Sequence, residues 1–158
     1  KLFQSLADGI INGHEHKATP YAIYSQFYKL YSADIMKRVR EEFFHFKYDM
    51  CVRAREESIY QKPIIFDSFE LDENIIYVEN EGYSLHHAGH GWVSDKFAIC
   101  SSNTMTRYAS FGQNFKVLNT TLYNKYPTTP EIYMKQYLLN GLGIKVVKDD
   151  RIGKIGRY

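Results

Sequence analysis

Histidine residues carry the clearest sign of chemistry in this sequence. Five of its six histidines lie within residues 14–16 and 86–90. Imidazole is the commonest protein ligand of zinc and similar divalent ions, and a site with three such ligands leaves a coordination position open for water. If the two groups meet in the folded chain, we expect them to bind an ion of this kind. The predicted metal ligands are His14, His16, His86 and His90.

A metal at the histidine groups would suit a small hydrolase, with phosphodiesters as the favoured substrates. The metal would activate a water molecule, and a carboxylate or an imidazole would remove its proton. Glu15 is the candidate general base, and His87 and His90 are the other candidate catalytic residues. The spacing matches no standard metal signature, and adjacent histidines in a turn are also common as solvated surface or as strand caps. Both interpretations of the histidines therefore stay open.

A basic C-terminal segment is the second distinctive feature. Residues 145–158 carry a net charge of +3, whereas the other 144 residues carry −1. The cations recur at every third position, and an extended chain with three residues per turn would align them along one edge. Such an arm suits the phosphates of a nucleic acid or an acidic protein groove, although charged C-termini also serve solubility alone. The candidate residues for binding an anionic partner are Lys145, Lys148, Arg151, Lys154 and Arg157.

Tyrosine is abundant, at 14 of 158 residues, and four tyrosines form a ridge with helical spacing. Ile23, Phe27 and Leu30 supply a second apolar face to the same segment, which is therefore apolar nearly all round. The ridge is either core or an interface, because tyrosine is enriched where one end of a side chain stays wet. The candidate interface residues are Tyr21, Tyr24, Tyr28 and Tyr31.

Helical patterns dominate the N-terminal part of the chain. Residues 2–11 and 19–58 are expected to be helical, with a break in the second segment near residues 32–34. The most regular apolar stripe recurs in steps of three and four, and we expect it to be buried core. Its members are Met36, Val39, Phe43, Phe46 and Met50.

Strand patterns follow, and they complete an α+β fold. Short β-branched or aromatic runs lie at 64–66, 74–79, 83–87, 96–100, 105–108 and 115–121. No helical pattern separates them, so the sequence predicts N-terminal helices packed on a mainly antiparallel meander sheet. A C-terminal helix (129–139) and a strand (144–147) follow. We expect a single domain over residues 1–148 and a basic tail over residues 149–158.

Composition limits the class of protein. With 44% apolar and 24% charged residues, the chain is neither disordered nor a polyionic tail protein. No run approaches the ~18 apolar residues of a membrane span, and no membrane partner is expected. Cys51 and Cys100 show no metal-binding spacing and are expected to be buried thiols, which favours a reducing compartment. The expected location is the cytoplasm of a cell or of an infected host, and the richness in Tyr, Lys, Ile and Asn indicates an AT-rich genome, a class that includes viral genomes.

Together these features favour a non-enzymatic interaction module. It would engage an anionic partner, nucleic acid or an acidic protein surface, through the basic tail and the tyrosine-rich surface. A small metal-dependent hydrolase that uses the clustered histidines is the alternative, with zinc or a similar divalent ion as its cofactor. A structural subunit of a larger assembly, viral or otherwise, is a further alternative, and it would make the protein an oligomer or part of one.

Overall fold

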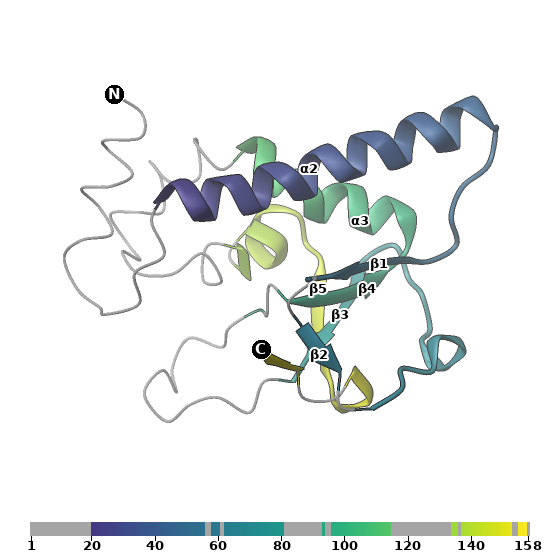
Figure 1. Ribbon diagram of the computed structural model, residues 1–158. Coiled ribbons are helices and arrows are strands. Elements are labelled where there is room, and N and C mark those ends of the chain that lie inside the picture. Colours follow the sequence, from purple (N-terminus) through teal and green to yellow (C-terminus); the bar gives the residue numbers. More distant parts are fainter. Residues whose placement is uncertain are drawn as a thin grey trace.

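A four-stranded sheet covered by two helices forms the centre of the molecule. The computed structural model describes residues 20–55, 58–60, 62–80, 93, 96–114, 134–135, 137–152 and 155–157. Helices α2 (Pro20–Phe43) and α3 (Ser102–Ala109) lie on the same face of the sheet (Figure 1). The strands, in their order across the sheet, are β1 (Cys51–Ala54), β4 (Phe97–Cys100), β3 (Ile75–Glu79) and β5 (Lys145–Asp149).

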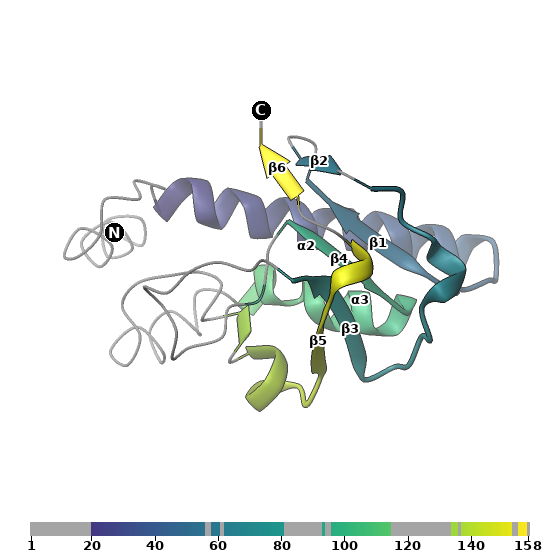
Figure 2. The ribbon, with the colours of Figure 1, turned by 90° about the horizontal axis from the view of Figure 1, so that it is seen from below.

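The opposite face of the sheet carries the shorter elements. Figure 2 shows this face, with α2 and α3 behind the strands. A two-stranded antiparallel ribbon lies here, formed by β2 (Ser58–Tyr60) and β6 (Ile155–Arg157). Three short helices complete the described chain: η1 (Phe66–Ser68) and η4 (Asp150–Ile152), and, on the side of α2 and α3, the π-helix η3 (Tyr137–Gly141).

The strand directions confirm the α+β class and correct the predicted meander. β4 is antiparallel to β3, as expected, and also to β1, which lies in the segment expected to be helical. β5, however, lies beside β3 and runs parallel to it. Parallel neighbours need a crossover connection, and here the chain passes through β4, α3 and η3 before it returns as β5. The sheet is therefore mixed.

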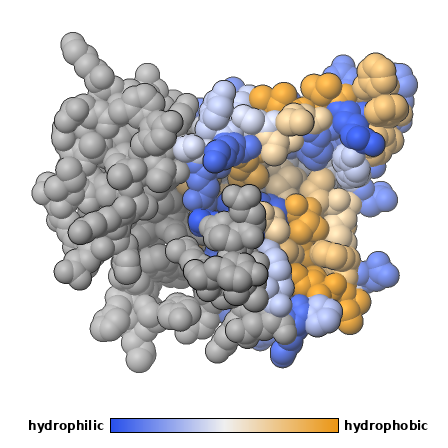
Figure 3. All heavy atoms as spheres, in the orientation of Figure 1, coloured by the Kyte–Doolittle hydropathy of each residue, from blue (hydrophilic) through white to orange (hydrophobic). Residues whose placement is uncertain are grey.

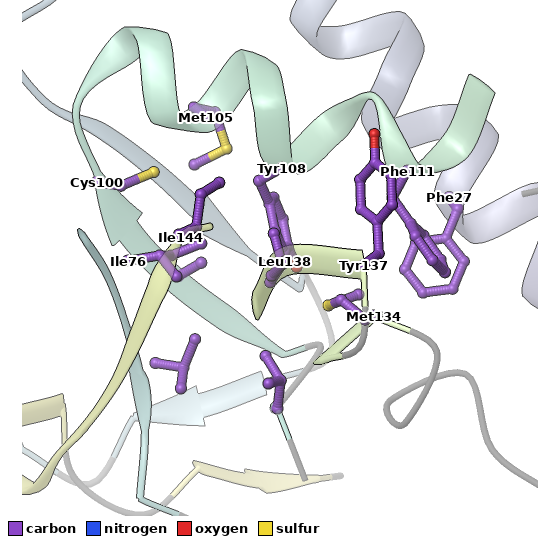
Figure 4. Packing of buried hydrophobic residues seen from close by; sticks show 13 residues of the cluster. Phe27, Ile76, Cys100, Met105, Tyr108, Phe111, Met134, Tyr137, Leu138 and Ile144 are labelled. Atoms are coloured by element: carbon purple, nitrogen blue, oxygen red, sulfur yellow. The ribbon is translucent and has the colours of Figure 1, made fainter. Parts of the chain in front are cut away.

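Apolar side chains form one cluster on each face of the sheet. Along β3, Ile76 and Val78 belong to the cluster under the helices, whereas Tyr77 belongs to the other. This alternation follows from the two-residue period of a strand. Figure 4 shows the cluster under the helices, where Met105 and Tyr108 of α3 reach toward the sheet.

The sequence identified some strands and misassigned others. Residues 64–66, expected to be a strand, form no strand and lead into η1. The runs at 74–79, 96–100 and 144–147 correspond to β3, β4 and β5, which confirms those three predictions. Residues 105–108, expected to be a strand, lie in α3 instead. The Ser101 side chain accepts a hydrogen bond from the backbone N–H of Thr104, and this cap starts the helix one residue after β4 ends.

Helix α2 differs from its prediction in length and in orientation. It runs without the break expected near residues 32–34 and ends at Phe43, well before residue 58. Its apolar stripe is not core: Met36, Val39 and Phe43 are 74%, 59% and 74% exposed. Phe46, just beyond the helix, is also exposed, and Met50 is only partly buried. The prediction of a buried stripe is therefore wrong.

The other face of α2 is the one that the fold buries. Among residues 25–43 of the helix, the fully buried ones are Phe27, Asp34 and Glu41, at intervals of seven. With 3.6 residues per turn, a residue two positions further along lies about 200° around the axis. Met36 and Phe43 each follow a buried acid by two positions, so burying the acids turns the apolar stripe outward.

Several predictions fall on parts of the chain outside the described residues. These are the helix at 2–11, the strands at 83–87 and 115–121, and most of the helix at 129–139. In the predicted basic tail, Ile152 of η4 is buried and β6 pairs with β2. The described part of the tail is therefore ordered against the fold, and its binding role stays a prediction.

The orientation of α2 predicts that substitutions on its buried face lower stability far more than substitutions on its exposed face. Phe27 is 1% exposed, and its ring centroid lies 4.5 Å from that of Phe111. Phe27→Ala should lower the free energy of unfolding by about 3–5 kcal/mol through lost burial and a cavity. Phe43→Ala should change it by less than about 0.5 kcal/mol. Urea denaturation followed by circular dichroism measures both, and equal losses would contradict this orientation of α2.

Candidate functional site

A buried group of charges joins α2 to α3. We call it the α2–α3 ionic network; its members are Asp34, Lys37, Glu41, Ser102 and Thr106. Lys37 Nζ lies 3.3 Å from Asp34 Oδ1 and 3.4 Å from Glu41 Oε2. The same ammonium donates hydrogen bonds to the hydroxyls of Ser102 and Thr106 on α3. Asp34 and Glu41 are only 4% and 2% exposed, so α2 is anchored by ion pairs that water hardly reaches.

Glu41 is the most heavily bonded member of this network. Its carboxylate accepts hydrogen bonds from the Ser102 hydroxyl, from the Tyr48 backbone N–H at 3.1 Å and from Lys47 Nζ at 3.2 Å. Burial raises the pKa of this carboxyl, but these hydrogen bonds and the charge of Lys37 outweigh burial and lower the pKa from 4.5 to about 2. Glu41 is therefore ionised in the folded protein, and it ties the chain after α2 back to the helix.

The outward face of α2 forms a surface of large apolar side chains. Figure 3 shows hydrophobic atoms gathered along α2 at the top of the molecule. Exposed basic residues lie among them, and the guanidinium of Arg40 stacks over the Phe44 ring, 5.6 Å from its centroid. We call this face and the turn that follows it the α2 apolar surface; its members are Ile35, Met36, Val39, Phe43, Phe44 and Phe46.

A third face of α2 borders an open groove. The α2–β1 groove has a volume of about 1140 Å³, and residues 51–55 line it from the β1 side. Apolar side chains such as Leu30 and Met105 also contribute to its wall. Its charged lining is mostly basic, with a single acid that already belongs to the ionic network. These charged residues are Lys29, Asp34, Lys37, Arg53 and Arg55.

The histidine groups predicted to hold a metal lie outside the described residues. This applies to both segments, and hence to His14, Glu15, His16, His86, His87 and His90. Among the residues that the structure does describe, no three His, Cys, Asp or Glu side chains are grouped so that they could hold a metal ion. The metal site and the catalytic roles therefore stay predictions.

The structure places three of the five tail cations. Lys145 and Lys148 are both exposed on β5, but an odd spacing along a strand points them to opposite faces. The Nε of Arg151 donates a hydrogen bond to the Asp149 carboxylate at 2.9 Å. The Arg151 guanidinium also lies 4.3 Å from the centre of the Phe69 ring. The hydrogen bond from Arg151 lowers the pKa of Asp149. These three cations do not share one edge, and the side chains of Lys154 and Arg157 lie outside the described part.

The tyrosine ridge divides between two environments. The side chains of Tyr21 and Tyr24 lie outside the described part of the chain. Tyr28 is 52% exposed. Tyr31 is half-buried where α2 meets Gly112, at which an added Cβ would lie 2.1 Å from the backbone oxygen of Phe27. The described half of the ridge is thus partly exposed, and its role as an interface stays a prediction.

The sequence analysis missed the basic residues of the groove. Lys29 and Arg53 are far apart in sequence, and the groove brings them together. The alternation Arg53-Ala54-Arg55 is the signal that could have identified part of this site. In a strand, such alternation places both guanidinium groups on the same face.

Comparisons with known proteins leave the site to be judged on its geometry. No protein-family model matches the sequence, and neither the curated proteins nor the solved structures gave a match. In the part of the chain that the structure describes, no helix is both long enough and apolar enough to cross a bilayer.

The ionic network predicts a specific loss of stability in acid. A carboxyl with a lower pKa in the folded than in the unfolded chain stabilises the fold fully above its unfolded pKa, here 4.5, and loses that contribution as the pH falls toward 2. Glu41→Gln should lower the free energy of unfolding at pH 7 by about 1–2 kcal/mol and flatten its pH dependence between pH 5 and 2.

Glu42→Gln is the matched control, because Glu42 is the exposed neighbour on the same helix. Urea denaturation across the acid range should give this variant the slope of the unaltered protein. If Glu41→Gln kept that slope too, the network would not contribute to stability.

Proposed function

We propose that the chain is a non-enzymatic interaction module that binds an acidic protein partner through the α2 apolar surface. The observation that carries this proposal is the orientation of α2, which buries two acids beside the partly buried Lys37 and leaves Met36, Val39 and Phe43 largely exposed. Large contiguous apolar patches on proteins mark interaction sites more often than they mark unused surface.

The energetics of this surface favour a partner that covers it. Burying one large apolar side chain is worth roughly 1.5–3 kcal/mol. The aromatic residues at the end of the surface pack against one another: the ring centroids of Phe43 and Phe44 are 4.9 Å apart, and those of Phe46 and Tyr48 are 4.7 Å apart. Such rigid aromatic groups are typical anchors of protein interfaces.

The charges beside the surface favour an acidic partner. Arg38, Arg40 and Lys47 are exposed here, against two exposed acids, Glu42 and Asp49. The remaining nearby carboxylates, Asp34 and Glu41, are buried. Protein interfaces are enriched in Met, Phe and Arg, whereas contacts to nucleic acid are dominated by polar groups on phosphates. An acidic protein surface therefore suits this face better than DNA or RNA.

A second candidate function follows from the same surface. If another copy of the chain or a permanent neighbour covered it, the protein would be a structural subunit of a larger assembly. The hydrolase alternative depends on histidines outside the described residues, and the metal content of protein prepared without chelator tests it.

A designed peptide tests the proposed function. The probe is a fluorescein-labelled amphipathic helix with a Leu face flanked by Glu, and the control peptide carries Lys in place of Glu. The acidic peptide should bind more tightly than the basic one. The double substitution Val39→Ser, Phe43→Ser should weaken binding at least about tenfold by removing apolar contact. Fluorescence anisotropy measures both dissociation constants.

Ile65→Ser is the control variant, since Ile65 is 70% exposed but lies outside the α2 apolar surface. It should bind the acidic peptide like the unaltered protein. Tighter binding of duplex DNA than of the peptide would contradict the proposal. Concentration-dependent dimers that the double substitution dissociates, seen by sedimentation velocity, would favour the structural-subunit function instead.

A further inference from the structure

We propose that the α2–β1 groove is a second binding site, which accepts an extended acidic peptide as an added strand on the edge of β1. This site is distinct from the α2 apolar surface, because it uses other residues on another face of the helix. It extends the proposed function by naming a second kind of partner segment.

β1 presents an unpaired edge to the groove. It lies at the end of the sheet, and among the described strands its partner is β4. The Arg55 backbone N–H donates to the Lys96 backbone oxygen at 3.0 Å, so the backbone groups of Arg55 point toward β4. Hydrogen-bonded positions alternate along an antiparallel pair, so the backbone groups of Arg53 point toward β4 as well. The N–H and C=O groups of Val52 and Ala54 therefore point away from the sheet.

The groove lies between α2 and this edge, and it reaches onto the helix-covered face of the sheet at Leu30 and Met105. Consecutive β1 residues of both faces line it, together with α2 residues on the opposite wall. Adding a strand to a free sheet edge is a general mode of peptide recognition, in which backbone hydrogen bonds give affinity and alternate side chains give specificity. A helix beside the edge supplies contacts for those side chains.

The charge of the groove selects an acidic peptide. Arg53 and Arg55 lie on the same face of β1, and Lys29 faces them from α2. The Nη1 atom of Arg53 is buried and has no hydrogen-bond partner among the described residues. A carboxylate is the natural partner of a guanidinium, which it can bind with two hydrogen bonds. Lys37 contributes less, because the ionic network already neutralises it.

The side chains of β1 point alternately to its two faces, and this alternation defines which peptide sequence fits the groove. Residues of an added strand that face Arg53 and Arg55 should be Glu or Asp, at every second position. The intervening residues should be small and apolar, because they lie beside Val52 and Ala54, which are exposed on the other face. A nucleic acid fits less well, because phosphates accept hydrogen bonds but do not donate to the outward C=O groups of β1.

The probe for this site is a short fluorescein-labelled peptide of alternating Glu and Val. It should bind the full chain with an affinity that falls as salt is raised. A peptide in which Lys replaces Glu should bind at least tenfold more weakly. Two further peptides, one N-methylated at every Glu and the other at every Val, should differ in affinity for the chain. Only one of these two sets of N–H groups faces β1 in an added strand, and only methylation of that set should weaken binding.

Two pairs of variants locate the binding on the protein. Lys29→Glu should weaken binding about tenfold, whereas Lys62→Glu, the same change at an exposed position outside the groove lining, should not. Ala54→Pro should abolish binding, because it removes an outward N–H that β4 does not use. Ala54→Val keeps that N–H and should bind. Circular dichroism of Ala54→Pro should match that of the unaltered protein.

The outcomes separate this site from the α2 apolar surface. The double substitution Val39→Ser, Phe43→Ser should leave binding of the Glu-Val peptide unchanged, so one proposal can fail without the other. Binding that Ala54→Pro and N-methylation leave intact would overturn the strand-addition proposal. The proposal would also be overturned if a single-stranded oligonucleotide bound more tightly than the Glu-Val peptide and Lys29→Glu removed that binding. The groove would then be a nucleic-acid site.

Discussion

The rest of the structure depends on the ion pairs of Lys37 with two buried carboxylates at the α2–α3 contact. An unpaired charge in that position would be strongly destabilising, whereas Asp34, Glu41 and the α3 hydroxyls satisfy it. Turning α2 about its axis to bury Met36 would break every one of these bonds. The close approach of Gly112 to the Phe27 backbone fixes the same orientation from the other end of the helix, because any side chain there would clash.

This one orientation gives α2 three different faces. The polar face is buried on α3, the apolar face is exposed, and the third face overlooks β1. The two proposed surfaces therefore both result from the same orientation of α2. A helix that buried its apolar stripe, as most amphipathic helices do, would expose neither the apolar side chains nor the same groove. The ionic network thus stabilises an orientation that leaves apolar side chains exposed, at some loss of hydrophobic stabilisation.

How much the sequence could predict depended on whether the signal was local. The class and strands β3, β4 and β5 were predictable, because short apolar runs bounded by turn residues fold alike in most contexts. The orientation of α2 was not predictable from the sequence. It depends on hydrogen bonds from Lys37 to Ser102 and Thr106, which lie 65 and 69 positions further along the chain. The parallel placement of β5 was also non-local. For the groove, the Arg53-Ala54-Arg55 alternation was visible, but the edge position of β1 is a property of the whole sheet.

The edge position of β1 gives its arginines a further physical role. A free strand edge is a template for unwanted pairing with other chains, and proteins commonly guard such edges with charge. Arg53 and Arg55 would place like charges opposite one another if two β1 edges paired in register, which disfavours association between copies of this chain. The same charges attract a strand that carries acids at alternate positions. Protection of the edge and selection of an acidic partner strand are therefore consequences of the same two side chains.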